Sequence, residues 1–472
     1  MGSGQVTDWQ GKHVTVAGLG VSGVPAARVL HARGAIVTVV NDGDDARARE
    51  QAAELEALGV TVRLGDGATL PEGTELIVTA PGWKPDKPLF TAARAAGIEI
   101  WGDVELAWRL RGPGAAPWLA VTGTNGKTST VQMLASVLKA AGLRTAAVGN
   151  IGVSLLDAVL GDEEYDVLAV ELSSYQLHWA PSLRAHSAAV LNLAPDHLDW
   201  HGSMEAYAAD KGRIYEGNRV ACVYNVADKL TEELVRGADV EEGCRAVGFT
   251  LGTPGPSQLG VVDGILVDRA FVENRQKNAQ ELAEVSDVNP PVPHNIANAL
   301  AAAALARAFG VPATAVRDGL RNFTPDAHRI AYVADVDGVA YIDDSKATNT
   351  HAAEASLASY ESIVWIAGGL AKGATFDELV ARSAKRLRGV VLIGADRALI
   401  REALARHAPE VPVVDLDRTD TGAMLAAVQE ARRLAVEGDT VLLAPACASM
   451  DMFANYNKRG DAFAQAVREL GA

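Results

Sequence analysis

Short hydrophobic runs alternate with segments of helical periodicity along most of the chain. In the first third, residues 14–17, 36–40 and 76–79 are hydrophobic runs of strand length, and residues 24–33 and 46–58 have the spacing of helices. Strands that alternate with helices in this way are typical of parallel sheets built from βαβ units. The pattern therefore predicts an α/β fold.

A second unit of the same kind follows a Gly- and Pro-rich linker at residues 111–117, whose composition opposes regular structure. Val131, Leu134 and Leu138 have the spacing of one helix face. The elements expected in this unit are a strand at residues 118–121, a helix after Lys127, a strand at 166–171, an irregular stretch at 251–264 and an Ala-rich helix after Pro293.

A third unit begins after a hinge at Phe323, Thr324 and Pro325. We expect strands at residues 339–342, 363–367, 390–393 and 441–444, with helices such as 376–387 between them. The units do not repeat at a fixed sequence period. The predicted domains are residues 1–112, 113–325 and 326–472.

Composition supports a large globular protein. At roughly 150 residues a domain, 472 residues allow about three domains, and 49% hydrophobic and 22% charged residues are near globular averages. The net charge of −16 argues against general binding to nucleic acid or anionic membranes. Three cysteines without a C-x-x-C pair, no apolar run of spanning length and no signal-peptide pattern predict a cytoplasmic protein without membrane insertion.

The segment TGTNGKT, residues 122–128, lies between a predicted strand and a predicted helix. Backbone N–H groups of such a loop and of the helix N-terminus can hold phosphates, with Lys127 reaching the β- and γ-phosphates and Thr128 binding Mg²⁺. Val121 takes the place of one glycine of the generic P-loop pattern, so the match is partial. ATP binding is favoured over an ordinary glycine turn before a helix.

Glu171 ends a predicted strand, at the sheet edge where ligands collect and where a carboxylate suits Mg²⁺. A solvated strand-end glutamate is an equally good interpretation.

His197 and His201 have the i, i+4 spacing of a helical zinc pair. A zinc protease would need Glu where Leu198 stands, so a loop histidine that helps a Mg²⁺ site is favoured over a zinc site.

The turn Gly18-Leu-Gly-Val-Ser-Gly23 follows a predicted strand, and Asp42 lies about twenty residues further on. Alone, this fingerprint predicts NAD. The same glycine turn can hold any diphosphate, including that of a UDP-sugar, so both interpretations stay open.

Three polar loops of the third unit follow predicted strands: residues 343–349, residues 368–372 with Lys372, and residues 446–449. Because the carboxyl ends of parallel strands share one edge of a sheet, these loops are expected to lie together. The alternative is that Lys346 and Lys372 are ordinary solvated lysines.

Taken together, separated motifs in a fixed order resemble the Mur ligases over nearly the whole chain. These motifs are TGTNGKT at 122–128, GNIG at 149–152, ELSSYQL at 171–177, NLAPDHLD at 192–199, HNIANA at 294–299, HR at 328–329 and DSKATN at 344–349. Residues 18–23, 344–349 and 444–449 are most similar to the members that add D-glutamate. The resemblance implies an N-terminal Rossmann-like sheet, a central P-loop ATPase-type domain and a C-terminal Rossmann-like domain.

The resemblance also implies an activity in cytoplasmic peptidoglycan precursor synthesis, and hence in cell wall biogenesis, cell shape and cell division. ATP, UDP-N-acetylmuramoyl-L-alanine and D-glutamate would give the amide, ADP and phosphate through an acyl phosphate. ATP is needed because a carboxylate is a poor electrophile, and the transferred phosphoryl group needs cations around it. Nothing in the sequence identifies protein partners or the oligomeric state.

Site roles carried over from the family fall into four groups. The ATP residues are Gly123, Thr124, Asn125, Gly126, Lys127, Thr128, Ser129, Asn295, Asn298, Arg329 and Asp344. Thr128, Glu171, His197 and Lys211, the last as a lysine carbamate, would hold Mg²⁺, and Lys127, His197, Lys211 and Lys346 would be catalytic. UDP-substrate residues would be Gly20, Val21, Ser22, Asp42, Pro81, Gly82, Asn150, Ser173 and Gln176, and D-glutamate residues Thr348, Lys372, Ser449, Met450 and Tyr456.

Some positions depart from the family pattern. Tyr456 stands where Phe is usual, Ala80 stands where Ser is common, and the acidic residues 43–45 do not reproduce the uracil-side pattern. The uracil contacts therefore stay open.

Three alternatives also stay open. MurC, MurE or folylpolyglutamate synthase share the P-loop chemistry, although the glycine-rich first domain speaks against them. An NAD-dependent dehydrogenase rests on residues 18–23 and Asp42 alone, and the third alternative is a nucleotide-dependent binding or switch protein without turnover.

Overall fold

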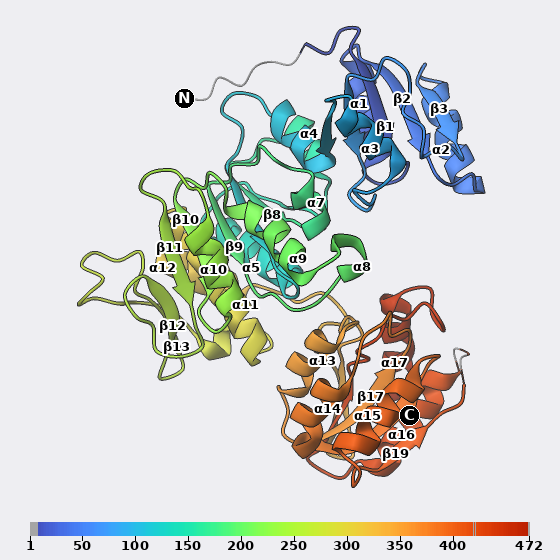
Figure 1. The fold of residues 1–472 in the computed structure, drawn as a ribbon. Coiled ribbons are helices and arrows are strands. Elements are labelled where there is room, and N and C mark those ends of the chain that lie inside the picture. The colour runs from blue at the N-terminus through green and yellow to red at the C-terminus, as the bar shows by residue number, and fades with distance from the viewer. Residues whose placement is uncertain (1–7, 419, 421, 471–472) are drawn as a thin grey trace. The chain divides into compact units, whose positions relative to one another are not determined.

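The computed structural model describes residues 8–418, 420 and 422–470, whose contacts divide the chain into two units. Unit 1 comprises Met1–Val288 and Ile296–Phe323, and unit 2 comprises Asn289–Asn295 and Thr324–Ala472. Unit 1 contains two sheets and unit 2 contains one, each with helices packed against it (Figure 1). The predicted α/β class is confirmed, and the three sheets correspond to the three predicted α/β units.

The first sheet is fully parallel, with strand order β3-β2-β1-β4-β5. Its elements are β1 (His13–Ala17), α1 (Gly23–Ala32), β2 (Ile36–Asn41), α2 (Ala46–Glu56), β3 (Thr61–Leu64), β4 (Leu76–Thr79), α3 (Pro88–Ala95), β5 (Glu99–Gly102) and α4 (Asp103–Leu110). Side chains alternate between its faces, so Val14 and Val16 pack with α1, α2 and α4, while Ala17 and Ile77 pack with α3. This doubly wound arrangement leaves the loop after β1 at the carboxyl edge of the sheet.

The second sheet has strand order β14-β13-β12-β11-β10-β9-β6-β8-β7 and is parallel from β7 to β12. Its strands are β6 (Trp118–Thr122), β7 (Ala147–Gly149), β8 (Leu168–Glu171), β9 (Ser187–Val190), β10 (Ala221–Asn225), β11 (Arg245–Phe249), β12 (Gln258–Val262), β13 (Ile265–Asp268) and β14 (Gln280–Glu284). The antiparallel β12, β13 and β14 extend the sheet at one end.

The helices of this part follow the same order along the chain. They are α5 (Lys127–Ala140), α6 (Leu155–Leu160), α7 (Ser174–His178), α8 (Leu198–His201), α9 (Met204–Gly212), η1 (Arg213–Tyr215), α10 (Lys229–Gly237), η2 (Val285–Asp287), α11 (Pro293–Ala308) and α12 (Ala313–Arg321). Leu119 and Val121 of β6 pack in one cluster with α5, α11 and α12, while Trp118 and Ala120 face the opposite side. The Ala-rich helix predicted after Pro293 is thus buried against the sheet.

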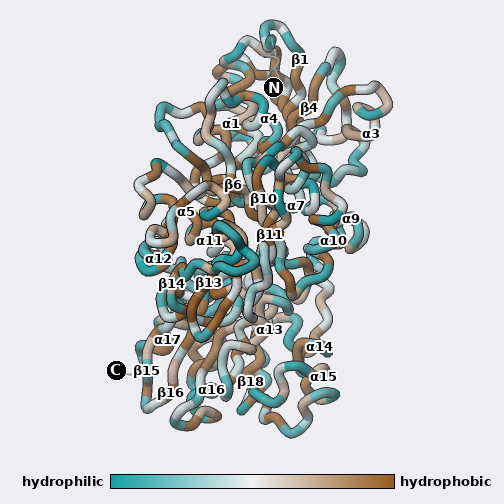
Figure 2. The backbone as a smooth tube through the Cα atoms, turned by 90° about the vertical axis from the view of Figure 1, so that its left-hand side faces the viewer, coloured by the Kyte–Doolittle hydropathy of each residue, from teal (hydrophilic) through white to brown (hydrophobic). Residues whose placement is uncertain are grey.

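The third sheet, in unit 2, has strand order β15-β16-β20-β17-β18-β19 and is parallel except for β15. Its elements are β15 (Ala331–Val336), β16 (Val339–Asp343), α13 (Thr350–Leu357), β17 (Ile363–Gly368), α14 (Asp377–Ser383), η3 (Ala384–Arg386), β18 (Leu387–Ile393), α15 (Arg397–His407), β19 (Val413–Asp415), α16 (Ala423–Leu434), β20 (Thr440–Leu443) and α17 (Tyr456–Leu470). Trp365 packs with α13, α14 and α15, and Val364 packs with α16 and α17. Figure 2 shows hydrophobic stretches along the strands and more hydrophilic ones in outer helices and loops.

Two predicted segments differ from the structure. The stretch at 251–264 contains β12, which pairs with β13 through the two-residue turn Asp263-Gly264. Both turn residues have positive φ, as the Asp-Gly hairpin turn requires, so this dipeptide was an available strand signal. The helix expected at 376–387 ends at Ser383, because residues from Leu387 pair with β17 as β18.

No helix within the described residues is long and apolar enough to cross a membrane.

Candidate active site

The loop between β6 and α5 is built for phosphate binding. The strand ends at Thr122, and α5 begins at Lys127 and runs for 14 residues. The first N–H groups of a helix lack partners within the helix and carry the positive end of its dipole, so they attract anions. Asn192 fixes the conformation of the loop, because Asn125 N donates to Asn192 Oδ1 (2.9 Å) and Asn192 Nδ2 donates to Asn125 O (3.1 Å).

Gly126 is required at the entry to α5 for two reasons. Its φ is +84°, in the left-handed region, and an added Cβ would lie 2.4 Å from Asn298 Oδ1. Asn298, on α11, is buried. The backbone of the phosphate loop therefore approaches Asn298, one of the two asparagines expected to bind ATP, as closely as only glycine permits.

We expect Gly126→Ala to lower kcat/KM for ATP by about tenfold, because a displacement of the phosphate loop misplaces the reacting groups. Gly142→Ala is the matched control: its φ is +79°, but nothing lies within 4 Å of the added Cβ. Both variants carry about 1 kcal/mol of backbone strain, measurable by thermal unfolding. Equal activity in the two variants would show that the clash with Asn298 is unimportant.

Lys127 lies over its own loop. Its Nζ donates to Gly123 O (2.9 Å) and Thr124 O (2.8 Å). Thr124 is itself held by Tyr207, with 3.0 Å between the two hydroxyl oxygens. The Lys127 ammonium group thus contacts two carbonyls of the phosphate loop. The amides of the same loop and the N-terminus of α5 are suited to bind phosphate.

Glu171 lies at the same edge of the sheet, since β8 pairs with β6 and Val121 is opposite Glu171. Asn150 Nδ2 donates to Glu171 Oε1 (2.9 Å), whereas the buried Oε2 has no hydrogen-bond partner. A buried carboxylate oxygen without a donor is costly, and a hard cation such as Mg²⁺ would satisfy it. The structure thus favours the metal interpretation of Glu171 over a solvated strand end.

Lys211, near the end of α9, is 2% exposed. Its Nζ donates to Gly123 O (2.8 Å) and Thr122 Oγ1 (3.3 Å), and it lies 4.9 Å from the centre of the Tyr207 ring. Burial and then the charge of Lys127 hold the pKa of Lys211 well below its usual range. The structure therefore brings this lysine to the phosphate loop as a readily deprotonated amine.

His197 precedes α8 and has a left-handed backbone with φ of 54°. Its Nδ1 lies 3.5 Å from Asp196 Oδ1, and its ring lies 4.9 Å from the Tyr175 ring. Burial, opposed by Asp196, lowers the pKa of His197. A neutral imidazole is the form that binds a metal.

The i, i+4 partner, His201, is not available as a second ligand. Its Nδ1 contacts Asp210 and its Nε2 contacts Ser174 Oγ, both at 2.9 Å. No group of three or more His, Cys, Asp or Glu among the described residues could hold a metal ion by itself. Mg²⁺ is commonly bound by one or two carboxylates together with substrate phosphates, and Glu171 supplies one such carboxylate at this edge of the sheet.

The first sheet carries an open pocket of about 430 Å³ at its carboxyl edge. Five predicted UDP-substrate residues line it: Gly20, Val21, Ser22, Pro81 and Gly82. Ser22 Oγ donates to the half-buried Asp103 (2.9 Å). Asp42 forms an ion pair with Lys87 (2.5 Å) and is not among the lining residues.

Asn41 and Arg47 also line this pocket and were missed from the sequence. Asn41 Oδ1 accepts from Leu19 N (3.1 Å), which holds the glycine turn. Arg47 is a cation in the first turn of α2. The available signal was an arginine two residues after Asp45, the last residue of the acidic run.

Ser173 and Gln176 cap α7 reciprocally. Ser173 Oγ accepts from Gln176 N (3.2 Å), and Gln176 Oε1 accepts from Ser173 N (3.0 Å). Asn150, which like Ser173 and Gln176 is a predicted UDP-substrate residue, donates to Glu171, and Glu171 begins the segment leading to α7. Asn150 is therefore hydrogen-bonded to Glu171, and Ser173, which caps α7, follows Glu171 by two residues.

The remaining predicted residues belong to unit 2. The loops after β16, β17 and β20 follow neighbouring parallel strands, so the expectation that they share one sheet edge is confirmed. Lys346 Nζ lies 4.1 Å from the centre of the Tyr456 ring, and Lys372 has a φ of 50°. Thr348, Ser449 and Met450 lie in these loops, where Ser449 is buried and Met450 is 61% exposed.

Three predicted nucleotide residues also belong to unit 2. Asp344 is buried, accepts a hydrogen bond from Ser356 Oγ, and has a pKa raised by burial to about 6. Arg329 lies 3.9 Å from Asp326. Asn295 Nδ2 donates to Pro290 O (3.3 Å) within the segment Asn289–Asn295.

Comparisons with known proteins match all three parts of the chain. Residues 12–102 match the Mur ligase MurD-like N-terminal domain, residues 121–306 the Mur ligase middle domain, and residues 328–447 the Mur ligase glutamate ligase domain. A curated relative from Streptomyces avermitilis is 89% identical over 99% of this chain and 100% of its own length. A relative from Thermobifida fusca is 59% identical over 98% of this chain and 99% of its own length. Both are named UDP-N-acetylmuramoylalanine–D-glutamate ligase.

Solved structures share the fold at low identity. UDP-N-acetylmuramate-alanine ligase MurC from Thermotoga maritima is 20% identical with a TM-score of 0.53, covering 97% of this chain and 99% of that one. MurF ligase from Thermotoga maritima, solved in complex with ADP, is 14% identical with a TM-score of 0.56, covering 98% and 96%.

Proposed function

This chain belongs to the Mur ligase family, and we propose that it joins D-glutamate to UDP-N-acetylmuramoyl-L-alanine with ATP, a cytoplasmic step of peptidoglycan precursor synthesis. It is an ATP-dependent acid–amino-acid ligase. The observation that carries the chemistry is that Lys127, Glu171 and Lys211 meet at the carboxyl edge of the second sheet. The observation that carries the substrate is the full-length 89% identity to a ligase of that name.

The phosphate loop performs the first step. The substrate carboxylate attacks the γ-phosphate of ATP, which gives an acyl phosphate and ADP. Negative charge spreads over the transferred phosphoryl group, and the Lys127 ammonium with the N-terminus of α5 stabilises that charge. The amine of D-glutamate then attacks the acyl carbon, and phosphate leaves as the amide forms.

Mg²⁺ fits the residues at this edge, because the buried Oε2 of Glu171 has no other partner. Glu171, Thr128, His197 and a carbamate at Lys211 are the residues proposed to hold it. When bound, Mg²⁺ supplies positive charge at the phosphate oxygens. The lowered pKa of Lys211 supports carbamate formation, because a neutral amine attacks CO₂ and releases one proton.

We propose that three domains divide the work, with boundaries at residues 1–112, 113–325 and 326–472. The pocket at the first sheet takes the UDP part of the substrate, through the loop after β1 and Pro81-Gly82. Asn150, Ser173 and Gln176 face the muramoyl-alanine part. Asn295, Asn298, Arg329 and Asp344 serve the nucleotide.

The test is phosphate release from ATP in the presence of UDP-N-acetylmuramoyl-L-alanine and a panel of amino acids that includes both glutamate enantiomers. We expect release that depends on D-glutamate. Release with L-alanine or a diamino acid instead would assign the chain to another ligase of the family, and ATP hydrolysis without any amino acid dependence would contradict ligation.

Lys372, with Thr348, Ser449, Met450 and Tyr456, is proposed to bind D-glutamate, whose two carboxylates need a cation and hydroxyl or amide donors. Lys372→Met keeps much of the apolar stem and removes the charge. We expect the KM for D-glutamate to rise about tenfold or more, since a charged hydrogen bond contributes about 1.5–3 kcal/mol, while the KM for ATP changes little.

Lys385→Met is the matched control for Lys372→Met, because Lys385 is an exposed lysine of unit 2 in η3, away from the three loops. It should leave both constants unchanged. If Lys372→Met raised the KM for ATP and left that for D-glutamate unchanged, Lys372 would belong to the nucleotide site.

A further inference from the structure

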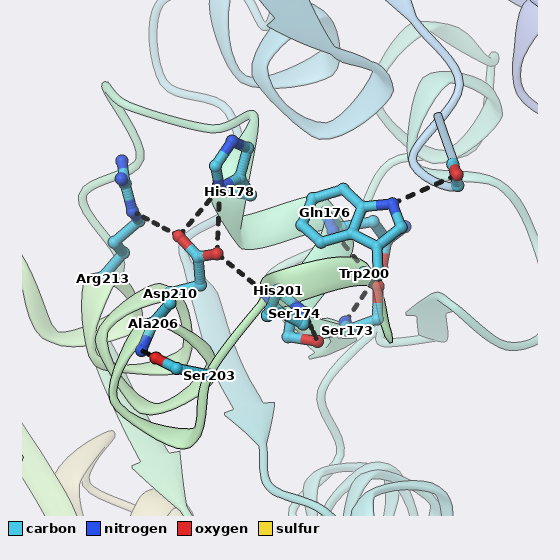
Figure 3. Close-up of polar contacts among 11 residues, drawn as sticks. Ser173, Ser174, Gln176, His178, Trp200, His201, Ser203, Ala206, Asp210 and Arg213 are labelled. Atoms are coloured by element: carbon cyan, nitrogen blue, oxygen red, sulfur yellow. Dashed lines mark hydrogen bonds and ion pairs between the residues drawn. The ribbon is translucent and has the colours of Figure 1, made fainter. Parts of the chain in front are cut away.

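A buried carboxylate links the short helices around the candidate active site. Asp210, in α9, has a side chain that is 8% exposed. His178 Nδ1 lies 2.9 Å from its Oδ2 and 3.0 Å from its Oδ1, His201 Nδ1 lies 2.9 Å from Oδ2, and Arg213 Nε donates to Oδ1 at 3.1 Å (Figure 3). These partners come from α7, α8 and η1.

The contacts fix the tautomers of both histidines. An ionised carboxylate can only accept hydrogen bonds, so Nδ1 of His178 and Nδ1 of His201 must each carry a proton. Three nitrogen atoms, from His178, His201 and Arg213, face the two oxygens of Asp210. His201, whose side chain is fully buried, contacts Ser174 Oγ through its Nε2 (2.9 Å). The network thus runs from α9 through His201 to the first residue of α7.

The helix α8 depends on this network. It has four residues, far fewer than a helix needs to be stable by itself, so tertiary contacts must hold it. His201, its last residue, is held by Asp210 and Ser174. Trp200 Nε1 donates to Gly82 O (3.2 Å), a carbonyl of the pocket on the first sheet.

Three of the helices that meet at Asp210 carry or directly follow a candidate site residue. His197 immediately precedes α8, Lys211 is the next residue after Asp210 in α9, and Ser173 immediately precedes Ser174 at the start of α7. The side-chain partners of the Asp210 carboxylate, His178, His201 and Arg213, all lie in short helices. The carboxylate therefore orders the site residues relative to one another.

We infer that Asp210 is a positioning residue of the ligase: through His201 and His178 it sets α7, α8 and α9 so that Ser173, His197 and Lys211 face the substrate and the phosphate loop together. The inference rests on the proposed function. It predicts effects on the UDP-linked substrate and on turnover, but a smaller effect on the KM for ATP, because the two hydrogen bonds between Asn125 and Asn192 also hold the phosphate loop.

The principal test is Asp210→Asn, which keeps the shape of the side chain and turns one acceptor oxygen into a donor. Because residues that orient site groups typically contribute 10- to 100-fold, we expect kcat to fall by about that factor. The KM for UDP-N-acetylmuramoyl-L-alanine should rise several-fold, roughly within the same range, while the KM for ATP stays nearly constant. A smaller folded fraction would lower kcat without this split between the two KM values.

A second readout needs no turnover. In protein labelled with ¹⁵N-histidine, the wild type should show His178 and His201 protonated at Nδ1, and Asp210→Asn should change the ring ¹⁵N shifts of both. The measurement uses the full chain without substrate. It therefore tests the network even if the wild type proves not to use D-glutamate, a result that would contradict only the proposed function.

Asp268→Asn is the matched control. Asp268 is a fully buried carboxylate in β13 that is paired with Arg307 of α11 (2.9 Å), and it lies outside the network. Both variants are expected to lower thermal stability, but Asp268→Asn should keep the wild-type KM values for both substrates and the wild-type ring ¹⁵N shifts of His178 and His201. Equal kinetic effects in the two variants would overturn the inference.

If Asp210→Asn fails to fold, Ser174→Ala removes only the contact to His201 Nε2. It should fold, raise the KM for the UDP-linked substrate and leave the KM for ATP unchanged. Wild-type kinetics in Ser174→Ala together with unfolded Asp210→Asn would reduce Asp210 to a stability role and overturn the proposal.

Discussion

Lys127→Ala is expected to lower kcat by about 10²- to 10³-fold, equivalent to roughly 3 kcal/mol or more of transition-state stabilisation. The reason is local: the Lys127 ammonium lies on the phosphate loop, against the carbonyls of Gly123 and Thr124. Charge on the transferred phosphoryl group develops in the transition state, so the missing cation should affect kcat more than the KM for ATP. Initial rates of D-glutamate-dependent phosphate release measure both constants.

The matched control for Lys127→Ala is Lys139→Ala in the same helix. Lys139 is exposed in the last turn of α5, so removing its side chain should leave the rate unchanged. Ligation at the wild-type rate by Lys127→Ala would remove this lysine from phosphoryl transfer. Equal losses in both variants would indicate damage to α5 rather than loss of a catalytic charge.

The fold could be predicted because its signals are local. Each buried parallel strand is a short hydrophobic run, and the predicted runs at 14–17, 76–79 and 118–121 coincide with β1, β4 and β6 within a residue. The phosphate loop was equally visible, since a glycine at positive φ and a lysine must stand at fixed positions before the helix. The error at 376–387 arose because pairing with β17 overrides the helical spacing of that segment.

The network around Asp210 could not be predicted in this way. His178, His201 and Asp210 lie in separate helices, and each is an unremarkable polar residue in its own segment. Their contact depends on how α7, α8 and α9 pack, which is a property of the tertiary structure. The spacing of His197 and His201 is that of a pair that binds one metal ion, but in the structure His201 contacts Asp210 and Ser174.

The first sheet shows the same limit for ligand binding. Its glycine turn predicted a diphosphate site but could not distinguish NAD from a UDP-sugar. The pocket is lined by Arg47 and Asn41, whereas Asp42, which was expected in either kind of site, pairs with Lys87. These side-chain contacts depend on the tertiary structure, so the glycine turn alone does not predict them.

Lys211→Ala is the second variant with a large expected effect. Its rate of phosphate release should be about 10²- to 10³-fold below that of the wild type. The side chain is buried at Gly123 O and Thr122 Oγ1, beside Lys127. An ammonium there would repel Mg²⁺, whereas a carbamate offers the oxygen ligands that Mg²⁺ prefers. The measurement is phosphate release at saturating substrates, compared with Lys229→Ala, which removes an exposed lysine at the start of α10.

Acetate rescue distinguishes a carbamate from a lysine needed as a cation. In Lys211→Ala, acetate can enter the vacated space and supply a carboxylate oxygen, so activity should rise with acetate concentration. Lys127→Ala should show no rescue, because its loss is that of a positive charge. Full activity of Lys211→Ala would contradict the carbamate, because no ligand at this position would then be needed. An unmodified Lys211 in a crystal structure with substrate and Mg²⁺ bound would also contradict it, because the buried amine would then serve the phosphate loop without becoming an oxygen ligand.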